Sequence, residues 1–336
     1  MDSYLSLLLL IFSVLSFAAP VKERGVQSFV FSGDAPFTVN TATLAAALKC
    51  PNGNPTASSP PVLLVHGTGS TGEETWGEGY VPALRSKGYT ACYVTLPGRA
   101  MGDMQTSSEY VAYAIHQLST LSSGARPAII THSQGGPVTQ WALRFWPSTA
   151  SIASAFIALS PDFAGIELFD SKLSNICVGK LCQASIWQQS SGSNYLAALH
   201  ADSFGAVVPT TAIWSVFDGI VMPPKDNAQL PGAAVMSVQD LCPGRLTSHP
   251  QMTVDAAGFA LALDALKHGG KASVSRARSD IFGTIGTCLR ITAPTMSVSV
   301  ANQVAGDIND VVGGFILGDP RVTKEPAVKA YAVNAS

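Results

Sequence analysis

The sequence contains few charged residues: Asp, Glu, Lys and Arg together make up 12% of its 336 residues, against roughly 25% in an average soluble protein. The formal net charge is −2, and no block of like charge occurs along the chain. A nucleic-acid-binding protein needs a basic patch, and a polybasic membrane anchor needs a run of Lys and Arg. The composition argues against both classes, so no nucleic acid is expected among the partners. Hydrophobic residues reach 47%, so part of the surface must be apolar.

Long apolar runs and metal-binding spacings are also missing. After the first residues no stretch reaches 18 uninterrupted apolar residues, which is the length expected of a transmembrane helix. No Cys-x-x-Cys occurs, and no histidine cluster lies near the cysteines in the sequence. We therefore expect no transmembrane segment in the mature protein, no metal and no cofactor.

The first 18 residues have the pattern of a signal peptide. Leu5 to Phe17 form an apolar run that is shorter than the roughly 20 residues of a membrane span. Ser16-Phe17-Ala18 then supplies the small-x-small pattern of a cleavage site. The preceding residues carry Asp2 and lack Lys and Arg, so a retained anchor is the alternative. We expect residues 1–18 to be removed and the protein to be secreted.

The cysteine count agrees with export. The six cysteines are an even number, and in an exported chain this predicts three disulfides, although the spacing alone leaves the pairing open. They are Cys50, Cys92, Cys177, Cys182, Cys242 and Cys288.

Strand and helix patterns alternate after an N-terminal arm over residues 19–58. Continuous apolar runs predict buried strands at 62–65, 89–96, 128–130, 155–159 and 211–217. Alternation of this kind predicts an α/β fold with a mostly parallel central sheet and helices on both faces. We expect a single catalytic domain over residues 59–336, with a lid-like insert at 165–191 and a C-terminal extension from about residue 290.

Two helices have clear boundary signals. Thr106-x-x-Glu109 is a capping-box pattern, which predicts that one helix begins near Thr106. Another helix is predicted over 256–268, and Gly269-Gly270 closes it.

A serine lies between a predicted strand and a predicted helix. In Thr131-His132-Ser133-Gln134-Gly135 the serine follows an apolar strand and precedes an amphipathic helix. A serine hydroxyl becomes a useful nucleophile only when a neighbouring base takes its proton, and a tight strand-to-helix turn exposes it for that chemistry. The first glycine of G-x-S-x-G is replaced by Thr131, and the alternative interpretation is an ordinary turn with an exposed serine. We predict that Ser133 is a nucleophile.

The partners of this serine should follow it along the chain in the order acid, then histidine, as in the α/β-hydrolases. Asp218 ends a predicted strand 31 residues before His249, which lies in a loop ahead of the helix at 256–268. His268 ends that helix, where a cation is favoured without any catalytic role. Asp162, at the end of the preceding strand, is the rival acid and is otherwise expected to be a polar pocket wall.

An oxyanion hole needs backbone N–H donors beside the nucleophile. The residue after it, Gln134, can supply one donor, and the turn over residues 66–69 (His-Gly-Thr-Gly) can supply another. This turn has neither G-x-G-x-x-G nor the lysine of a P-loop, so it does not predict a nucleotide site.

Several motifs occur in a fixed order along the chain: Val65 to Gly72, Thr131 to Gly136, Gln140-Trp141, Phe145 to Ser148, Pro161 to Phe163, Trp187 to Gln189, Val208 to Thr211, and Asp218 to Val221. Together they resemble the fungal lipase B family, whose best-known member is Candida antarctica lipase B, and the resemblance runs from about residue 45 to 290.

The resemblance implies a triad of Ser133, Asp218 and His249. It further implies an oxyanion hole made by the amide and hydroxyl of Thr68 and the amide of Gln134. The remaining implied features are polar pocket residues Asp162 and Gln189, an apolar wall at Ile220, and the disulfides Cys50–Cys92 and Cys242–Cys288.

The chain also departs from this family. His66 replaces a proline, His132 replaces a tryptophan beside the nucleophile, and Ser248 replaces an aspartate. Cys177 and Cys182 have no counterpart, and we hypothesise that they pair and clamp the lid-like insert.

The sequence therefore predicts a secreted serine hydrolase that cleaves carboxylic esters, foremost a triacylglycerol lipase or esterase, as a monomer that transiently contacts a lipid interface. The alternatives are an esterase or acyltransferase on soluble or polymeric esters, a non-catalytic binding protein, and a secreted peptidase. A glycosylation sequon begins at Asn334.

Overall fold

The structure is a computed structural model that describes residues 27–167, 181–201, 204–279, 286–304, 306 and 321–333. The predicted signal peptide, Cys177 and Asn334 lie outside these residues.

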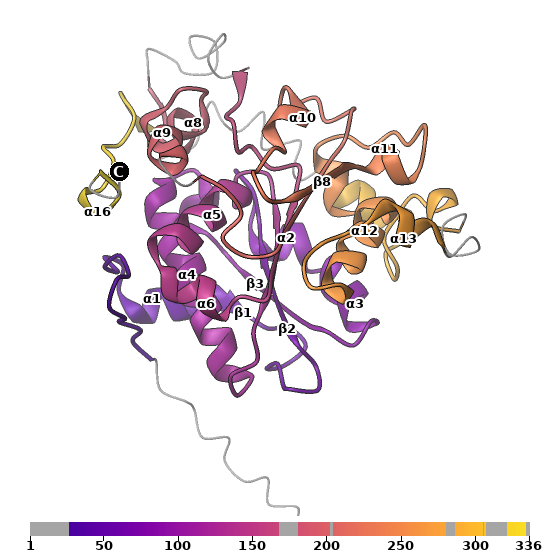
Figure 1. Ribbon diagram of the computed structural model, residues 1–336, viewed down its shortest axis with the longest axis horizontal. Coiled ribbons are helices and arrows are strands. Elements are labelled where there is room, and N and C mark those ends of the chain that lie inside the picture. The colour runs from indigo at the N-terminus through magenta and orange to yellow at the C-terminus, as the bar shows by residue number, and fades with distance from the viewer. Residues whose placement is uncertain are drawn as a thin grey trace, which may run out of the picture.

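A seven-stranded sheet runs through the centre of the molecule (Figure 1) in the order β1-β3-β2-β4-β5-β7-β8. Neighbouring strands are parallel except at the edge, where β1 pairs antiparallel with β3. The strands are β1 (Leu48–Lys49), β2 (Pro61–Val65), β3 (Thr90–Val94), β4 (Ala128–His132), β5 (Ala155–Leu159), β7 (Thr210–Trp214) and β8 (Ala234–Ser237). All five predicted strands are thus confirmed. The predicted arm contributes β1, which the sequence pattern had not indicated.

Helices cover both faces of the sheet (Figure 1). One face carries α1 (Thr41–Ala47), α4 (Met104–Leu121), α5 (Gly135–Phe145) and α6 (Pro147–Ile152). The other carries α3 (Tyr80–Arg85), α11 (Val238–Leu241), α12 (Ala256–Lys267) and α13 (Val274–Ser279). Side chains of a strand point alternately to its two faces, so Leu63 and Val65 join one hydrophobic cluster and Val62 and Leu64 join the other. Burial on both faces explains why this strand reads as a continuous apolar run.

The remaining elements are short. They are α2 (Gly72–Trp76), a 3₁₀ turn η1 (Pro97–Ala100), β6 (Cys182–Gln183), α8 (Ala184–Gln189), α9 (Asn194–His200), α10 (Pro224–Asn227), a second 3₁₀ turn η2 (Pro250–Thr253), β9 (Arg321–Val322) and α16 (Ala330–Val333).

One predicted helix boundary was wrong. Helix α4 begins at Met104, and its N-cap is Asp103, whose side chain accepts a hydrogen bond from the amide of Gln105. Thr106 therefore lies inside the helix. Glu109 is fully buried and accepts hydrogen bonds from the amides of Thr38 and Val39. Its carboxylate therefore binds a distant segment of the chain, whereas the capping-box pattern predicted that it would bind the N-terminus of its own helix. The other predicted boundary is confirmed, because α12 ends at Lys267 and Gly269 and Gly270 have positive φ.

The last described segment, residues 321–333, joins distant helices to one another. Strand β9 pairs with β6, and the carboxylate of Glu325 accepts hydrogen bonds from the first two amides of α9. Lys329 donates from its amide to Gln105 and from its Nζ to Glu109 on α4, and the hydroxyl of Tyr331 accepts from Trp141 on α5. The C-terminal part of the chain thus completes the helical layer on this face.

Two predicted disulfides are present, Cys50–Cys92 and Cys242–Cys288. Cys182 is also disulfide-bonded, and its predicted partner Cys177 lies outside the described residues. In the described part of the chain, no helix is both long and apolar enough to cross a membrane.

Candidate active site

Ser133 occupies a tight turn between β4 and α5. Its φ is +55°, a left-handed conformation that is uncommon for any residue other than glycine. Its amide donates to the carbonyl of Leu159 at 3.0 Å, and its carbonyl accepts from the amide of Gly136 at 2.8 Å. A serine held in this way at the end of a parallel strand has the geometry of a nucleophile elbow.

Glycines surround this turn because backbone and side chains approach too closely for a Cβ. A Cβ on Gly67 would lie 2.7 Å from the Cβ of Ser133, and one on Gly136 would lie 2.8 Å from the Cβ of Pro161. A Cβ on Gly135 would lie 2.8 Å from the carbonyl oxygen of Val65. Thr131 is fully buried within β4 itself, so the turn tolerates a larger residue there and needs its glycines at the positions that follow.

His249 and Asp218 form a buried pair. Nδ1 of His249 lies 2.8 Å from Oδ2 of Asp218, and the two side chains are 4% and 1% exposed. The amide of His249 also donates to the carbonyl of Asp218 at 2.9 Å. The structure therefore brings together the two residues that the sequence singled out as acid and base.

The acid is fixed by its own turn after β7. Oδ1 of Asp218 accepts hydrogen bonds from the amides of Ile220 and Val221, at 3.1 and 2.7 Å. Burial alone would raise the pKa of Asp218, but the charge and hydrogen bond of His249 and the amide of Val221 outweigh it and hold the pKa below its ordinary value. The carboxylate is thus ionised at neutral pH. Ile220, the predicted apolar wall, is half-buried beside it.

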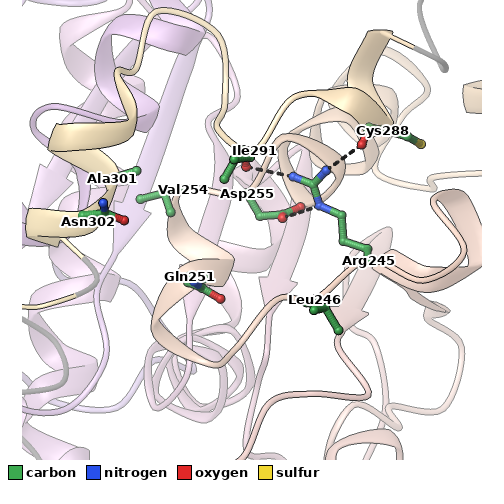
Figure 2. Close-up of a pocket in the computed structure, with 9 residues that line it drawn as sticks. All are labelled: Arg245, Leu246, Gln251, Val254, Asp255, Cys288, Ile291, Ala301 and Asn302. Atoms are coloured by element: carbon green, nitrogen blue, oxygen red, sulfur yellow. Dashed lines mark hydrogen bonds and ion pairs between the residues drawn. The ribbon is translucent and has the colours of Figure 1, made fainter.

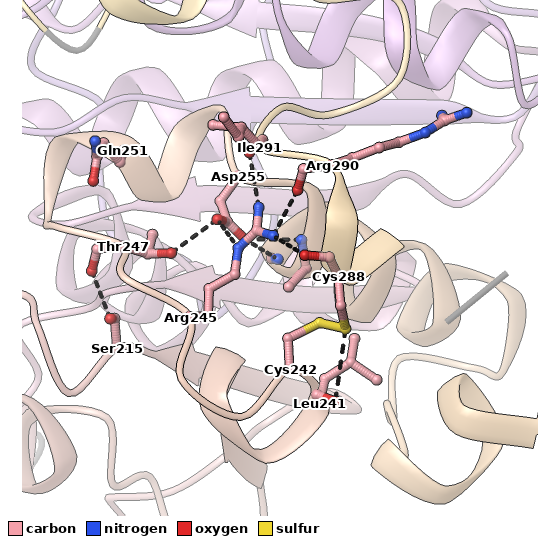
Figure 3. A network of polar contacts seen from close by, with 12 residues as sticks. Ser215, Leu241, Cys242, Arg245, Thr247, Gln251, Asp255, Cys288, Arg290 and Ile291 are labelled. Carbon is pink, nitrogen blue, oxygen red and sulfur yellow. Dashed lines mark hydrogen bonds and ion pairs between the residues drawn. A yellow bond between two sulfur atoms is a disulfide. The ribbon is translucent and has the colours of Figure 1, made fainter. Parts of the chain in front are cut away.

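The loop that carries His249 is anchored by a polar network (Figure 3). Arg245 donates from Nε to Asp255 at 2.7 Å and from its terminal nitrogens to the carbonyls of Cys288, Arg290 and Ile291. The hydroxyl of Thr247 also donates to Asp255 at 2.8 Å. Neither Arg245 nor Asp255 was singled out by sequence, since a lone Arg and a lone Asp ten residues apart carry no motif.

A cavity of about 240 Å³ lies beside this network (Figure 2). Its lining includes Arg245, Leu246, Gln251, Asp255 and Ile291 but none of the candidate catalytic residues. It is therefore distinct from the candidate catalytic site.

The predicted oxyanion donors lie on two neighbouring turns. The hydroxyl of Thr68 lies 3.0 Å from Oε1 of Gln134 and 3.1 Å from Oε1 of Gln189, so its one proton has two acceptors. The structure thus brings these three predicted residues together. The backbone amides of Thr68 and Gln134 donate no hydrogen bond to any described residue, which leaves them available to a ligand.

His66 holds the first of these turns. The amide of Leu96 donates to Nε2 of His66 at 2.9 Å, so Nδ1 carries the proton and donates to the carbonyl of Gly67 at 2.8 Å. Burial lowers the pKa of His66 to about 4 and keeps the ring neutral. The sequence indicated His66 as part of the predicted oxyanion turn and as a replacement for proline, but not as the residue that holds this turn.

Asp162 is fully buried, and neither of its side-chain oxygens has a hydrogen-bond partner among the described residues. Burial raises its pKa to about 7, and the nearby charge of Asp218 acts in the same direction. Asp162 thus differs from Asp218, because its own amide and the charge of His249 lower its pKa too little to outweigh burial.

No group of three His, Cys, Asp or Glu side chains is placed to hold a metal ion among the described residues. The strand order, the Ser133 turn and the buried His–Asp pair define an α/β-hydrolase.

Comparison with known proteins places this α/β-hydrolase more narrowly. Lipase B of Pseudozyma antarctica is 31% identical over 315 residues, which cover 91% of this chain and 89% of that relative. The crystal structure of Aspergillus fumigatus lipase B matches with a TM-score of 0.81 at 30% identity, and the match covers 90% of this chain and 74% of that one. No protein-family model matches the chain. The chain belongs to the lipase B family and is a carboxylic-ester hydrolase.

Proposed function

We propose that this hydrolase is a secreted lipase in which Ser133 is the nucleophile, His249 the general base and Asp218 the orienting acid. The 2.8 Å contact between Nδ1 of His249 and Oδ2 of Asp218 carries the proposal. An ionised Asp218 accepts the Nδ1 proton, so Nε2 of the neutral ring has a free lone pair for the hydroxyl proton of Ser133.

The reaction then has two steps, acylation of Ser133 and hydrolysis of the acyl-enzyme. Ser133 attacks the ester carbonyl as its proton passes to His249, and the tetrahedral oxyanion is stabilised by the amides of Thr68 and Gln134 and by the Thr68 hydroxyl. Collapse of this intermediate breaks the bond to the alcohol, which leaves with the proton from His249, and an acyl group remains on Ser133. Water then attacks the acyl-enzyme with the same proton transfers, and a carboxylic acid is released.

The substrate class is an ester with an apolar acyl chain, foremost a triacylglycerol. Asp162, Gln189 and Ile220 are proposed to line the pocket. Two apolar side chains just before Asp218, Val216 and Phe217, are 49% and 48% exposed. Exposed apolar side chains beside a candidate catalytic acid suit transient contact with a lipid interface, and secretion is proposed from residues 1–18.

The mechanism is tested by Ser133→Ala in an assay with p-nitrophenyl esters. The variant is expected to lose hydrolysis and labelling by a fluorophosphonate probe, with unfolding temperature unchanged. Turnover that survives the substitution would refute the role of Ser133.

The substrate class is tested with the unmodified protein and an ester panel of graded acyl length, presented both in solution and as an emulsion. A lipase is expected to hydrolyse emulsified long-chain triacylglycerol. Activity on soluble short esters alone would point to an esterase.

A further inference from the structure

His132 connects the candidate nucleophile to the candidate base. It is the last residue of β4, lies opposite Leu159 of β5 in the sheet and directly precedes Ser133. Its side chain is buried, and Nε2 lies 3.0 Å from the main-chain carbonyl oxygen of His249. The two imidazole rings are also in contact, with centroids 4.5 Å apart.

The hydrogen bond fixes the protonation of the ring. A carbonyl oxygen can only accept, so Nε2 of His132 carries the proton and donates it. Burial, with His249 acting in the same direction, lowers the pKa of His132 to about 3. The charged or titratable groups that act on it are His249, Asp218 and His66, and His66 is itself neutral. A neutral ring here places no like charge beside His249 when His249 becomes protonated during the reaction.

We propose that His132 is a positioning residue for ester hydrolysis, which holds the base in register with the nucleophile. The inference rests on the proposed triad. His249 is held by four hydrogen bonds, because its amide and Nδ1 bind Asp218 and its carbonyl accepts from Nε2 of His132 and, at 3.3 Å, from the amide of Met252. Since Ser133 follows His132 in the chain, one segment at the end of β4 carries the nucleophile and also binds the base.

Two substitutions of His132 separate the contribution of its hydrogen-bond donor from that of its aromatic ring. His132→Phe keeps an aromatic ring and removes the donor, whereas His132→Gln keeps an N–H at nearly the reach of Nε2. The matched control is His116→Phe, because His116 is also buried and bonded through Nε2, but to Ser148. Each purified variant is assayed with p-nitrophenyl esters beside Ser133→Ala. The proton of the His249–Asp218 hydrogen bond is followed by its low-field NMR resonance.

His132→Phe is expected to lower kcat about tenfold, the size of effect expected for one lost hydrogen bond, and to change KM less than about twofold. Its low-field resonance should broaden. His132→Gln is expected to keep kcat within about threefold of the parent and to retain the resonance, as is His116→Phe.

The inference is overturned if His132→Phe has the kcat of His116→Phe, or if His132→Gln loses as much as His132→Phe. When Ser133→Ala is inactive, such a result removes the role of His132 and leaves the triad intact. Turnover by Ser133→Ala would instead overturn the triad, and the role of His132 with it.

Discussion

Nε of Arg245 lies 2.7 Å from Oδ2 of Asp255, and their side chains are 9% and 5% exposed. Arg245 also binds three carbonyls of the segment 288–291, which the Cys242–Cys288 disulfide reaches as well. The hydrogen bonds of Arg245 and the disulfide therefore join the same segment to the loop that carries His249.

Arg245→Met should lower the free energy of unfolding by about 3 kcal/mol, because it leaves a buried carboxylate without its cation and removes the hydrogen bonds of Arg245 to three carbonyls. Urea unfolding measures the change. The control is Arg290→Met, whose side chain is exposed and which should cost less than about 0.5 kcal/mol. Equal losses of unfolding free energy in the two variants would mean that the buried pair stabilises the protein no more than an exposed arginine does.

Gly67→Ala should move the nucleophile. The added Cβ would lie 2.7 Å from the Cβ of Ser133 and 3.3 Å from its Oγ, and a displacement near 1 Å can cost about 100-fold in rate. We expect kcat for p-nitrophenyl esters to fall by roughly that factor. Gly102→Ala is the matched control, since a Cβ there meets open space and neither glycine has a left-handed φ. Unaltered kcat in Gly67→Ala would contradict the packing argument.

Thr68→Val should remove one donor to the oxyanion and keep the shape of the side chain. Loss of a single donor of this kind costs about 100- to 1,000-fold in kcat. Thr68→Ser retains the hydroxyl and is expected to keep most of the activity. If valine and serine give the same kcat, the hydroxyl takes no part in the reaction and only the amides remain as donors.

Asp162 should make stability depend on pH. Its pKa of about 7 in the folded protein lies above the ordinary value of 3.8, so the folded state holds a proton that the unfolded chain releases. The corresponding stabilisation is complete below about pH 4 and is lost as the pH rises through about 7.

Asp162→Asn keeps the neutral shape and removes this titration. The stability of the variant relative to the parent should therefore rise between about pH 4 and about pH 7, by on the order of a few kcal/mol, and stay level above this range. Thermal unfolding across this range measures the difference, and Asp226→Asn, at an exposed carboxylate, is the control. A difference between Asp162→Asn and the parent that does not vary with pH would show that Asp162 is ionised in the folded state throughout.

The fold was largely predictable because its strands are buried on both faces. Runs such as residues 62–65 and 155–159 need no tertiary information to be recognised as strands. Glu109 shows the limit of local patterns, since it matches a capping box and yet binds Thr38 and Lys329. Contacts of such sequence separation leave no periodic signal.

The candidate site was predictable to a similar degree. The order of Ser133, Asp218 and His249 along the chain is the order that the α/β-hydrolases give to nucleophile, acid and histidine. The roles of His66 and His132 could not be predicted, because each depends on hydrogen bonds to main-chain groups, including a carbonyl that accepts from the ring. Such a contact requires no particular residue type on the accepting side.

The hydrogen bonds of Glu325 and Lys329 can form only late in the synthesis of the chain. Lys329 reaches back over 224 positions to Gln105, and Glu325 caps a helix that was synthesised about 130 residues earlier. During synthesis, α4 and α9 therefore leave the ribosome long before the side chains that satisfy them. The contacts that residues 321–333 make with these two helices can therefore form only after that segment has been synthesised.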